Sequence, residues 1–541
     1  MHEQGSIPIS DAGDKRWRYR LIAATLIVLS AGLHLAYLAA HFAFDLAPDE
    51  AHYWDWSRRL DWSYYSKGPL VAYLIRAGIE VAGPISRQLT QTDMWAVRLP
   101  AVLCGSLLLL SLYVLTVQVT KREKLALGVV AIALTLPLVA AGSSLMTIDA
   151  PYTCIWGWAL VLGYQAAIRR SPWAWPALGL LLGLGMLAKY TMLLWLPSFG
   201  LFLLTSRRHR PLLSSFAFWA MVFIAFVCCL PILIWNAQHD WVTFRHVGGQ
   251  AGVTENGGIR WLGPLNYLGT QFAVLLGFWF VVWVAAMLAY RPGWDQDEGR
   301  QYLWWLSMTT FAVFCLFSFK NGGGQANWPV TAYLAGLVLT ANWIADRWQR
   351  RVIRTSVFAA AATGLLLIFC MHFTVALQPL LARISGKPSA KHPFPLRRFD
   401  PTCRIRGWRF LANEVDRVRQ QLREEGIEPV LVASGWNLPG EIGFYCQGQP
   451  QVYSFGLVFG DRWSQYDLWR PNPLFDPEYF AGKTFVLIGP SHPCLGEAFD
   501  HVEPSRIVTY QENGHPIAQW GITVCRGYRG FSRFHPQVEK F

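Results

Sequence analysis

The sequence has few charged residues for its length. Only 15% of its 541 residues are Asp, Glu, Lys or Arg, whereas an ordinary soluble domain carries about a quarter. Hydrophobic residues make up 53%, the mean hydropathy is +0.26, and the sequence contains no internal repeat or low-complexity segment. The shortage of charge excludes an ordinary soluble domain and predicts a chain that is mostly embedded in lipid.

The N-terminal segment lacks a signal-peptide cleavage site. Four basic residues precede the apolar run Leu21–Ala40, which has no short small-residue site and, at about 20 residues, is long enough to cross a bilayer. We expect this run to be a signal anchor, with residues 1–20 in the cytoplasm.

Apolar runs recur along the chain and predict a mainly α, polytopic membrane protein with about eleven transmembrane helices. Connections rich in Lys and Arg alternate with the others, and the positive-inside rule places the basic ones in the cytoplasm. The formal charge of +13 therefore belongs to loops, and no nucleic-acid partner is expected. The predicted spans are Leu21–Ala40, Leu99–Val119, Leu125–Ala141, Pro151–Ile168, Trp175–Leu187, Thr191–Leu204, Phe216–Ile234, Leu265–Tyr290, Tyr302–Phe319, Pro329–Ile344 and Val357–Leu377.

The same pattern divides the chain into domains. Residues 1–20 form the cytoplasmic N-terminus, residues 21–382 the membrane domain with an outer loop at 45–98, and residues 383–541 a tail on the outer, periplasmic face. The N-terminus and the tail lie on opposite sides because the number of spans is odd.

The tail has the pattern of a small α/β domain. Phe410–Glu425 alternates apolar and charged residues at helical spacing and is followed by Gly426, a helix stop. Short apolar runs beginning at Pro429 and Thr484 are typical of buried strands. The four cysteines of this region allow three disulfide pairings, which the sequence leaves open.

The outer loop contains a segment dense in polar and aromatic residues, Pro48–Pro69. Carboxylates at a bilayer edge are costly unless something uses them, so Asp49 and Glu50 are candidate catalytic residues. A helix start also explains them, because acids behind a proline at the first helical position are favoured by the helix dipole. The candidate substrate-binding residues of the loop are Tyr53, Trp54, Tyr64 and Tyr65, whose rings suit a sugar, and Lys67, which suits a phosphate.

These residue types match transfer of a sugar from a lipid phosphate. Such a donor already has a good leaving group, so the reaction needs a carboxylate base for the acceptor hydroxyl and cations for the phosphate. One displacement by one base inverts the anomeric centre. Asp49 is the predicted base, with Glu50 orienting the acceptor or the loop, while Lys67 also fits an ordinary lysine at a membrane interface.

Two further lysines and a second acid belong to the same predicted face. Lys189 interrupts an apolar stretch, which marks it as a functional candidate, although a turn outside the membrane explains it equally. Lys320 is a third cation on this face. Asp149 begins a span, where helix capping is the commoner role and lining a cavity is the functional one.

The sequence assigns no metal site. His239 and His246 lie seven residues apart without other ligands to complete a shell. The Asp-x-Asp pair Asp295 and Asp297 lies in a short inside loop without a Rossmann unit. No cofactor is assigned, and a divalent metal is left open.

Several motifs occur in an order that resembles a known family. Over roughly residues 20–380 the chain resembles the bacterial relatives of the protein O-mannosyltransferases, which include the lipid A aminoarabinose transferases. The motifs are Pro48-Asp-Glu-Ala-His-Tyr-Trp, Lys67-Gly-Pro-Leu, Arg98-Leu-Pro, Thr147-Ile-Asp-Ala-Pro, Trp235-Asn-Ala-Gln-His-Asp-Trp-Val-Thr-Phe and Asn327-Trp-Pro-Val-Thr-Ala-Tyr.

The resemblance implies a GT-C fold, a polyprenyl-phosphate sugar donor and an active site on the periplasmic face. It implies that Asp49 is the base, that Asp149 is the second acid and that Lys67 contacts the donor phosphate, and it adds Asn327 to the substrate-binding candidates. The chain departs from many relatives in having Gly68 where they have a first proline. The tail after Ala382 matches none of these motifs.

We therefore expect an inverting glycosyltransferase of the inner membrane. It would move a sugar from an undecaprenyl- or dolichyl-type phosphate to lipid A, a glycan or another envelope acceptor. The alternative is a transporter or flippase of lipid-linked sugars, which would explain the spans and the cations but would be expected to show repeats. A membrane-anchored sensor would leave the loop carboxylates unexplained.

Overall fold

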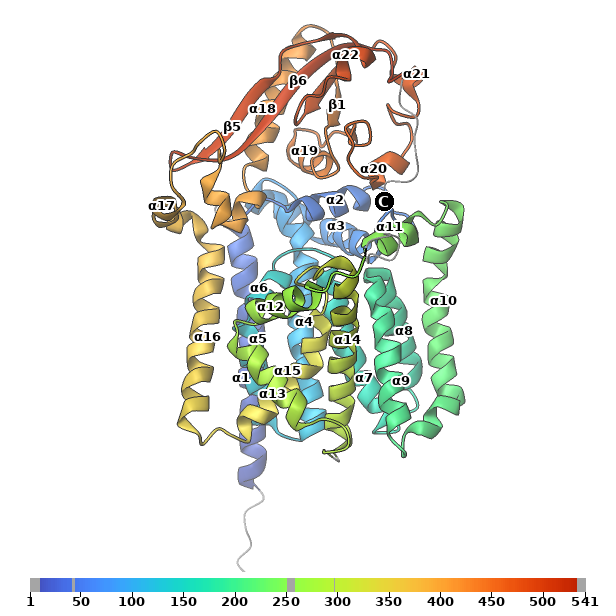
Figure 1. Ribbon diagram of the computed structural model, residues 1–541, viewed down its shortest axis with the longest axis vertical. Helices are drawn as coiled ribbons and strands as arrows, with labels where there is room; N and C mark the ends of the chain where they lie inside the picture. The colour runs from blue at the N-terminus through green and yellow to red at the C-terminus, as the bar shows by residue number, and fades with distance from the viewer. Residues whose placement is uncertain (1–9, 41–43, 251–257, 296, 533–541) are drawn as a thin grey trace, which may run out of the picture. The chain divides into compact units, whose positions relative to one another are not determined.

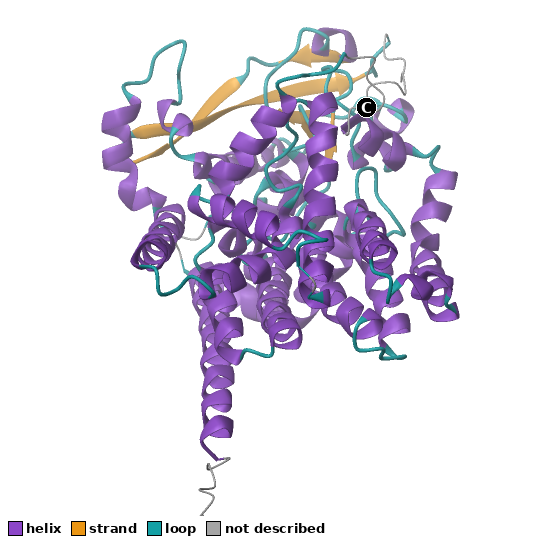
Figure 2. Cartoon of the chain, turned by 60° about the horizontal axis from the view of Figure 1, so that its bottom comes forward, coloured by secondary structure: helices purple, strands orange, loops and turns teal. Residues whose placement is uncertain are grey.

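The computed structural model describes residues 10–40, 44–250, 258–295 and 297–532. It is mainly helical, and its named strands belong to one sheet (Figure 2). Contacts divide the chain into two compact units. Unit 1 consists of Met1–Ala36, Ala101–Ala237 and Gly248–Ile368, and unit 2 consists of Tyr37–Pro100, Gln238–Val247 and Phe369–Phe541.

Unit 1 is built from apolar helices, as the sequence predicts. Within the described residues, five helices are long and apolar enough to cross a membrane, and a bent pair makes a sixth. The helices are α1 (Ser10–Ala39), α4 (Met94–Thr120), α5 (Glu123–Leu134), α6 (Pro137–Gly142), α7 (Asp149–Ala167), α8 (Ala174–Ala188), α9 (Trp195–Thr205), α10 (Phe216–Gln238), α12 (Gly263–Val274), α13 (Phe278–Ala289), α14 (Glu298–Asn321), α15 (Val330–Ala345) and α16 (Arg351–His372).

Three of the predicted continuous spans are broken. The run Val357–Leu377 divides at Phe373, because α16 ends at His372 and the next helix begins at Thr374. The run Leu125–Ala141 divides into α5 and α6 because Pro137 opens the second helix and cannot donate to a preceding turn. The run Leu265–Tyr290 divides into α12 and α13, which meet at 113°. Gly277 at this break has a φ of +65°, which glycine adopts without a side-chain clash.

Packing within unit 1 brings together three helix ends. The helix α7 packs along α8, and α15 packs along both α13 and α14 (Figure 1). A short 3₁₀ turn, Tyr190–Leu194, follows α8 and leads into α9. The start of α7, the end of α8 and the segment before α15 carry the polar side chains described below.

Unit 2 combines the outer loop with the tail. This differs from the predicted grouping, in which the loop belonged to the membrane domain. Its helices are α2 (Pro48–Ser57), α3 (Leu70–Thr90), α11 (Val242–Gln250), α17 (Thr374–Ser385), α18 (Trp408–Glu424), α19 (Pro439–Tyr445), α20 (Gln465–Leu468), α21 (Pro477–Phe480) and α22 (Leu495–Ala498), and its strands are β1 (Val430–Ala433), β2 (Val452–Ser454), β3 (Phe485–Ile488), β4 (Phe499–Val502), β5 (Arg506–Glu512) and β6 (His515–Tyr528).

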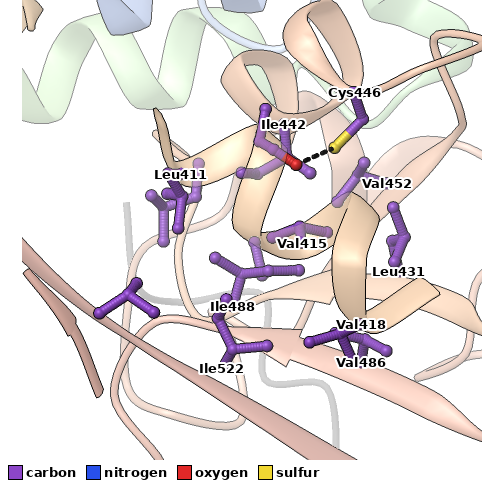
Figure 3. Close-up of a cluster of buried hydrophobic side chains, with 14 of the residues drawn as sticks. Leu411, Val415, Val418, Leu431, Ile442, Cys446, Val452, Val486, Ile488 and Ile522 are labelled. Atoms are coloured by element: carbon purple, nitrogen blue, oxygen red, sulfur yellow. Dashed lines mark hydrogen bonds between the residues drawn. The ribbon is translucent and has the colours of Figure 1, made fainter. Parts of the chain in front are cut away.

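The tail forms the predicted α/β domain. Its sheet has the order β2-β1-β3-β6-β4, with β5 paired to β6, and the first three strands are parallel while β6 runs antiparallel to its neighbours. The helix α18 places Leu411, Val415 and Val418 on one face. Figure 3 shows these side chains packed against Val486 and Ile488 of β3.

Candidate functional site

Asp149 and Lys189 form an ion pair in unit 1. Lys189 Nζ donates to Asp149 Oδ1 over 2.7 Å, and the two side chains are 10% and 21% exposed, respectively. Lys189 is the residue at which α8 ends, and its backbone is extended rather than helical. Asp149 does not cap α7, whose cap residue is Ile148. The helix-capping role considered for Asp149 is therefore not observed, and its side chain pairs with Lys189 instead.

Asn327 completes this polar cluster. Its Nδ2 donates to Asp149 Oδ2 over 2.6 Å, so both carboxylate oxygens accept a hydrogen bond. Tyr152, one turn further along α7, has its ring centroid 5.3 Å from Lys189 Nζ and its hydroxyl 3.3 Å from Thr331 Oγ1. Predicted site residues that are far apart in the sequence thus meet at one place in unit 1.

An apolar cavity of about 260 Å³ adjoins the cluster and is lined by Asp149 and Asn327. Ligand sites are commonly apolar with a few placed polar groups, and this cavity has that composition. Its other lining side chains are mostly hydrophobic and include Leu108, Leu112, Leu136, Val139, Trp279, Trp283, Tyr333 and Leu334.

The three acids of α2 in unit 2 have different surroundings. Asp49 is exposed in the first turn. Glu50 is fully buried, and its two oxygens accept from Arg98 over 2.9 and 2.7 Å. Asp55 is buried, and this burial raises its pKa to about 6. Among these three acids, Asp49 is the one whose side chain is exposed.

Arg98 fixes the entry to α2. Besides Glu50, it donates to the carbonyl oxygens of Phe44 and Asp45 over 2.9 and 2.7 Å. Glu50 also accepts from the Ala47 amide over 2.9 Å. Glu50 thus joins Arg98 to the backbone at the start of α2.

The aromatic rings of the loop serve packing. The Trp54 ring meets Phe444 edge-on at 5.0 Å, and Tyr64 stacks on Trp56 at 4.3 Å. Trp54 is 2% exposed and Tyr64 is fully buried. The sugar-stacking role predicted for these two rings is not supported by this arrangement, because their faces are covered. Tyr53 and Tyr65 are also buried.

The tail holds the loop at several points in unit 2. Asp45 accepts from the Trp408 amide over 2.9 Å and pairs with Arg409 at 3.0 Å. The Leu46 amide donates to the Tyr445 hydroxyl over 2.7 Å. These contacts join residues more than 360 positions apart, so the sequence pattern alone could not indicate them.

The remaining predicted site residues have separate places. Lys67 is partly buried in the loop, where its carbonyl oxygen accepts from the Tyr64 amide over 3.2 Å. Lys320 is exposed in the last turn of α14. Asp295 pairs with Arg300 at 2.8 Å, and Asp297 caps α14, which agrees with the structural interpretation of that pair. Among the residues that the structure describes, no group of three His, Cys, Asp or Glu could hold a metal ion.

Comparisons with known proteins show which proteins this chain is similar to. Residues 66–235 match the family model described as dolichyl-phosphate-mannose-protein mannosyltransferase. The chain is 31% identical over 331 residues to the lipid A galacturonosyltransferase RgtD of Rhizobium johnstonii. That alignment covers 60% of this chain and 66% of the relative, so the chain spans just under two thirds of the relative's length.

The fold is similar to two crystal structures of ArnT from Cupriavidus metallidurans. The structure bound to undecaprenyl phosphate has a TM-score of 0.57 at 15% identity and covers 95% of this chain and 99% of ArnT. The apo structure has a TM-score of 0.55 at 13% identity, with coverages of 92% and 97%. This chain has the GT-C fold of these structures. The predicted GT-C fold and multi-pass membrane character are therefore confirmed.

Some side chains at these two polar clusters could not be singled out from the sequence. Tyr152 directly follows one motif and Thr331 lies within another, but neither carries a charge near neutral pH that would mark it. Arg98 also lies in a motif, yet its partner Glu50 is 48 positions away. A buried arginine next to a predicted span was the available signal.

The contact between α19 and α2 gives a test of how the tail holds the GT-C loop. A Cβ added to Gly440 would lie 2.6 Å from the Ala51 carbonyl oxygen and 2.8 Å from the His52 amide nitrogen. Gly440→Ala is therefore expected to push α19 from α2 and to destabilise unit 2 by about 1–3 kcal/mol. Thermal unfolding measures this effect.

Gly496 supplies the matched control, because a Cβ there has no atom within 4 Å. Gly496→Ala should unfold with the wild type. Equal stability of both variants would contradict tight packing of α19 on the loop.

Proposed function

We propose that this protein is an inverting glycosyltransferase that moves a sugar from a polyprenyl phosphate to a lipid or glycan acceptor. The observation that carries the proposal is the cluster of Asp149, Lys189 and Asn327 beside an apolar cavity. A charged head and an apolar wall suit a lipid phosphate better than a soluble nucleotide sugar. The rings predicted to stack on the sugar are not needed for this argument.

In the proposed reaction, the acceptor oxygen bonds to the anomeric carbon as the bond from that carbon to the phosphate oxygen breaks. The acceptor proton passes to Asp49, and the electron pair leaves with the polyprenyl phosphate. Lys189 offsets the charge that grows on the phosphate. Asp149 and Asn327 keep the Lys189 ammonium in place.

The relatives support the substrate class. A similar protein is named a lipid A galacturonosyltransferase, and a similar fold was crystallised with undecaprenyl phosphate. We propose undecaprenyl-type donors and acceptors of the lipid A class. We also propose that the protein lies in the inner membrane with its N-terminus in the cytoplasm, and that the loop and the tail face the periplasm.

The direct test is transfer by purified protein in liposomes. Polyprenyl-phosphate sugar with lipid A acceptor should yield glycosylated lipid and free polyprenyl phosphate with inverted anomeric configuration. A nucleotide sugar should yield none. Transfer from the nucleotide sugar, or retention of configuration, would refute the proposal.

Lys189→Met tests the cation of the cluster. Its removal should lower kcat about 100-fold, because a preorganised charge is lost where the phosphate becomes more negative. The rate is measured with saturating donor. Lys124→Met, at an exposed lysine of unit 1, should stay within about twofold of the wild type. Equal rates for both variants would remove Lys189 from the mechanism.

A further inference from the structure

Arg462 of the tail carries a positive charge without a carboxylate partner. Its guanidinium lies 4.6 Å from the Trp436 ring centroid, and Nη1 donates to His246 Nε2 over 3.3 Å. Asp461 accepts the Arg462 backbone amide over 2.8 Å. Within residues 10–40, 44–250, 258–295 and 297–532, no carboxylate is ion-paired with this guanidinium. Arg462 is partly buried, where an uncompensated charge is costly.

His246 presents an unused donor beside Arg462. An arginine can only donate, so His246 Nε2 must accept and the neutral ring carries its hydrogen on Nδ1. Burial, followed by the positive charges of Arg462 and Lys67, lowers the pKa of His246 to about 3 and keeps the ring neutral. Its Nδ1 is buried and has no partner in the part of the chain that the structure describes.

Tyr65 adds a second unused donor. Its ring centroid lies 4.9 Å from that of His246, and its backbone amide is held by Gln465 of the tail over 2.7 Å. The Tyr65 hydroxyl is buried without a hydrogen-bond partner among the described residues. Buried polar groups of this kind are normally satisfied, if not by protein then by water or a ligand.

Asp467 is an acid close enough to Tyr65 to act on its pKa. Asp467 Oδ2 accepts from the Ser464 amide and hydroxyl over 2.7 and 2.8 Å. Burial raises the pKa of Asp467 to about 7, so about half of these carboxyl groups are protonated and uncharged near neutral pH. The Asp467 carboxylate is thus already engaged by Ser464, and among the described residues no carboxylate is ion-paired with the Arg462 guanidinium.

We propose that Arg462, His246 and Tyr65, together with Lys67, form a binding site for a phosphate group. A phosphate offers several acceptor oxygens, and the planar guanidinium matches their spacing. This inference rests on the proposed function for the source of the phosphate, which is either the polyprenyl donor or a phosphorylated lipid acceptor. It gives the tail a direct part in substrate recognition.

The test measures binding of lipids to the full-length protein in nanodiscs. The probes are undecaprenyl phosphate, lipid A and chemically dephosphorylated lipid A. Arg462→Gln should weaken binding of one phosphorylated probe about 10- to 100-fold, and Tyr65→Phe about three- to tenfold. The affected probe identifies the source of the phosphate. Binding of dephosphorylated lipid A should not change.

Two further variants separate charge from folding. Arg462→Lys keeps the cation and should recover part of the lost affinity. Arg404→Gln, at an exposed arginine of the tail, should bind all probes as the wild type does. If Arg462→Gln and Tyr65→Phe bind both phosphorylated probes normally, or lose dephosphorylated lipid A equally, the site is refuted.

Binding and turnover fail separately. If the wild type transfers no sugar, and Arg462→Gln still binds the phosphorylated probe more weakly than the wild type, the proposed function is refuted and the phosphate site is retained. If the wild type transfers sugar normally, and Arg462→Gln binds every probe as the wild type does, the phosphate site is refuted and the proposed function is retained.

Discussion

Replacing Asp49 with asparagine is expected to lower kcat by about 10³-fold while leaving KM for the donor within about threefold. The amide cannot take the acceptor proton, but it keeps the size and the hydrogen-bonding shape of the side chain. Asp49 is the exposed acid of α2, whereas Glu50 is ion-paired and Asp55 is buried. The measurement is initial rate against donor concentration in liposomes.

Glu80→Gln is the matched control for this change. Glu80 is an exposed acid of α3 in the same unit and pairs with Arg76 at the surface. Its substitution should leave kcat unchanged, because a surface pair contributes little. Unchanged turnover in Asp49→Asn would show that another group accepts the proton.

Arg98→Met is expected to destabilise unit 2 by about 3–5 kcal/mol, since it leaves the Glu50 carboxylate buried without its partner. The arginine is 1% exposed and also satisfies two backbone carbonyl oxygens. A loss of this size should lower the unfolding temperature by on the order of 10 °C. Scanning calorimetry on detergent-solubilised protein measures it.

Arg98→Lys separates charge from geometry. A lysine keeps the positive charge but cannot donate to both Glu50 oxygens and both carbonyl groups, so an intermediate loss is expected. Full stability of the methionine variant would mean that the pair does not hold the loop.

The cluster of unit 1 could be predicted from the sequence because its charged residues lie in otherwise apolar stretches. Lys189 and Asp149 interrupt apolar stretches, and a charge in such a stretch needs a partner or a function. The structure pairs them at 2.7 Å. The apolar helices were also readable from hydropathy, except where the chain breaks at Pro137, Gly277 and Phe373.

The loop was harder to predict because aromatic composition does not distinguish a ligand face from a core. Trp54 and Tyr64 are compatible with either role, and only the rings that they contact in the structure show that they belong to the core. The tail residues Arg409, Gly440 and Tyr445 contact a loop that lies more than 360 positions earlier in the sequence, and no local pattern indicates such contacts. Strands β2 and β4–β6 were also missed, because none of them is a continuous apolar run like those that marked β1 and β3.

The composition of unit 2 restricts how this protein can be recombined with its relatives. A chimera that imports only a foreign C-terminal domain would set new side chains against the native Asp45, Leu46 and Ala51, whose partners would be gone. A workable transplant has to move three separate stretches together, Tyr37–Pro100, Gln238–Val247 and Phe369–Phe541. The packing of the loop on the tail would then be inherited as a block rather than residue by residue.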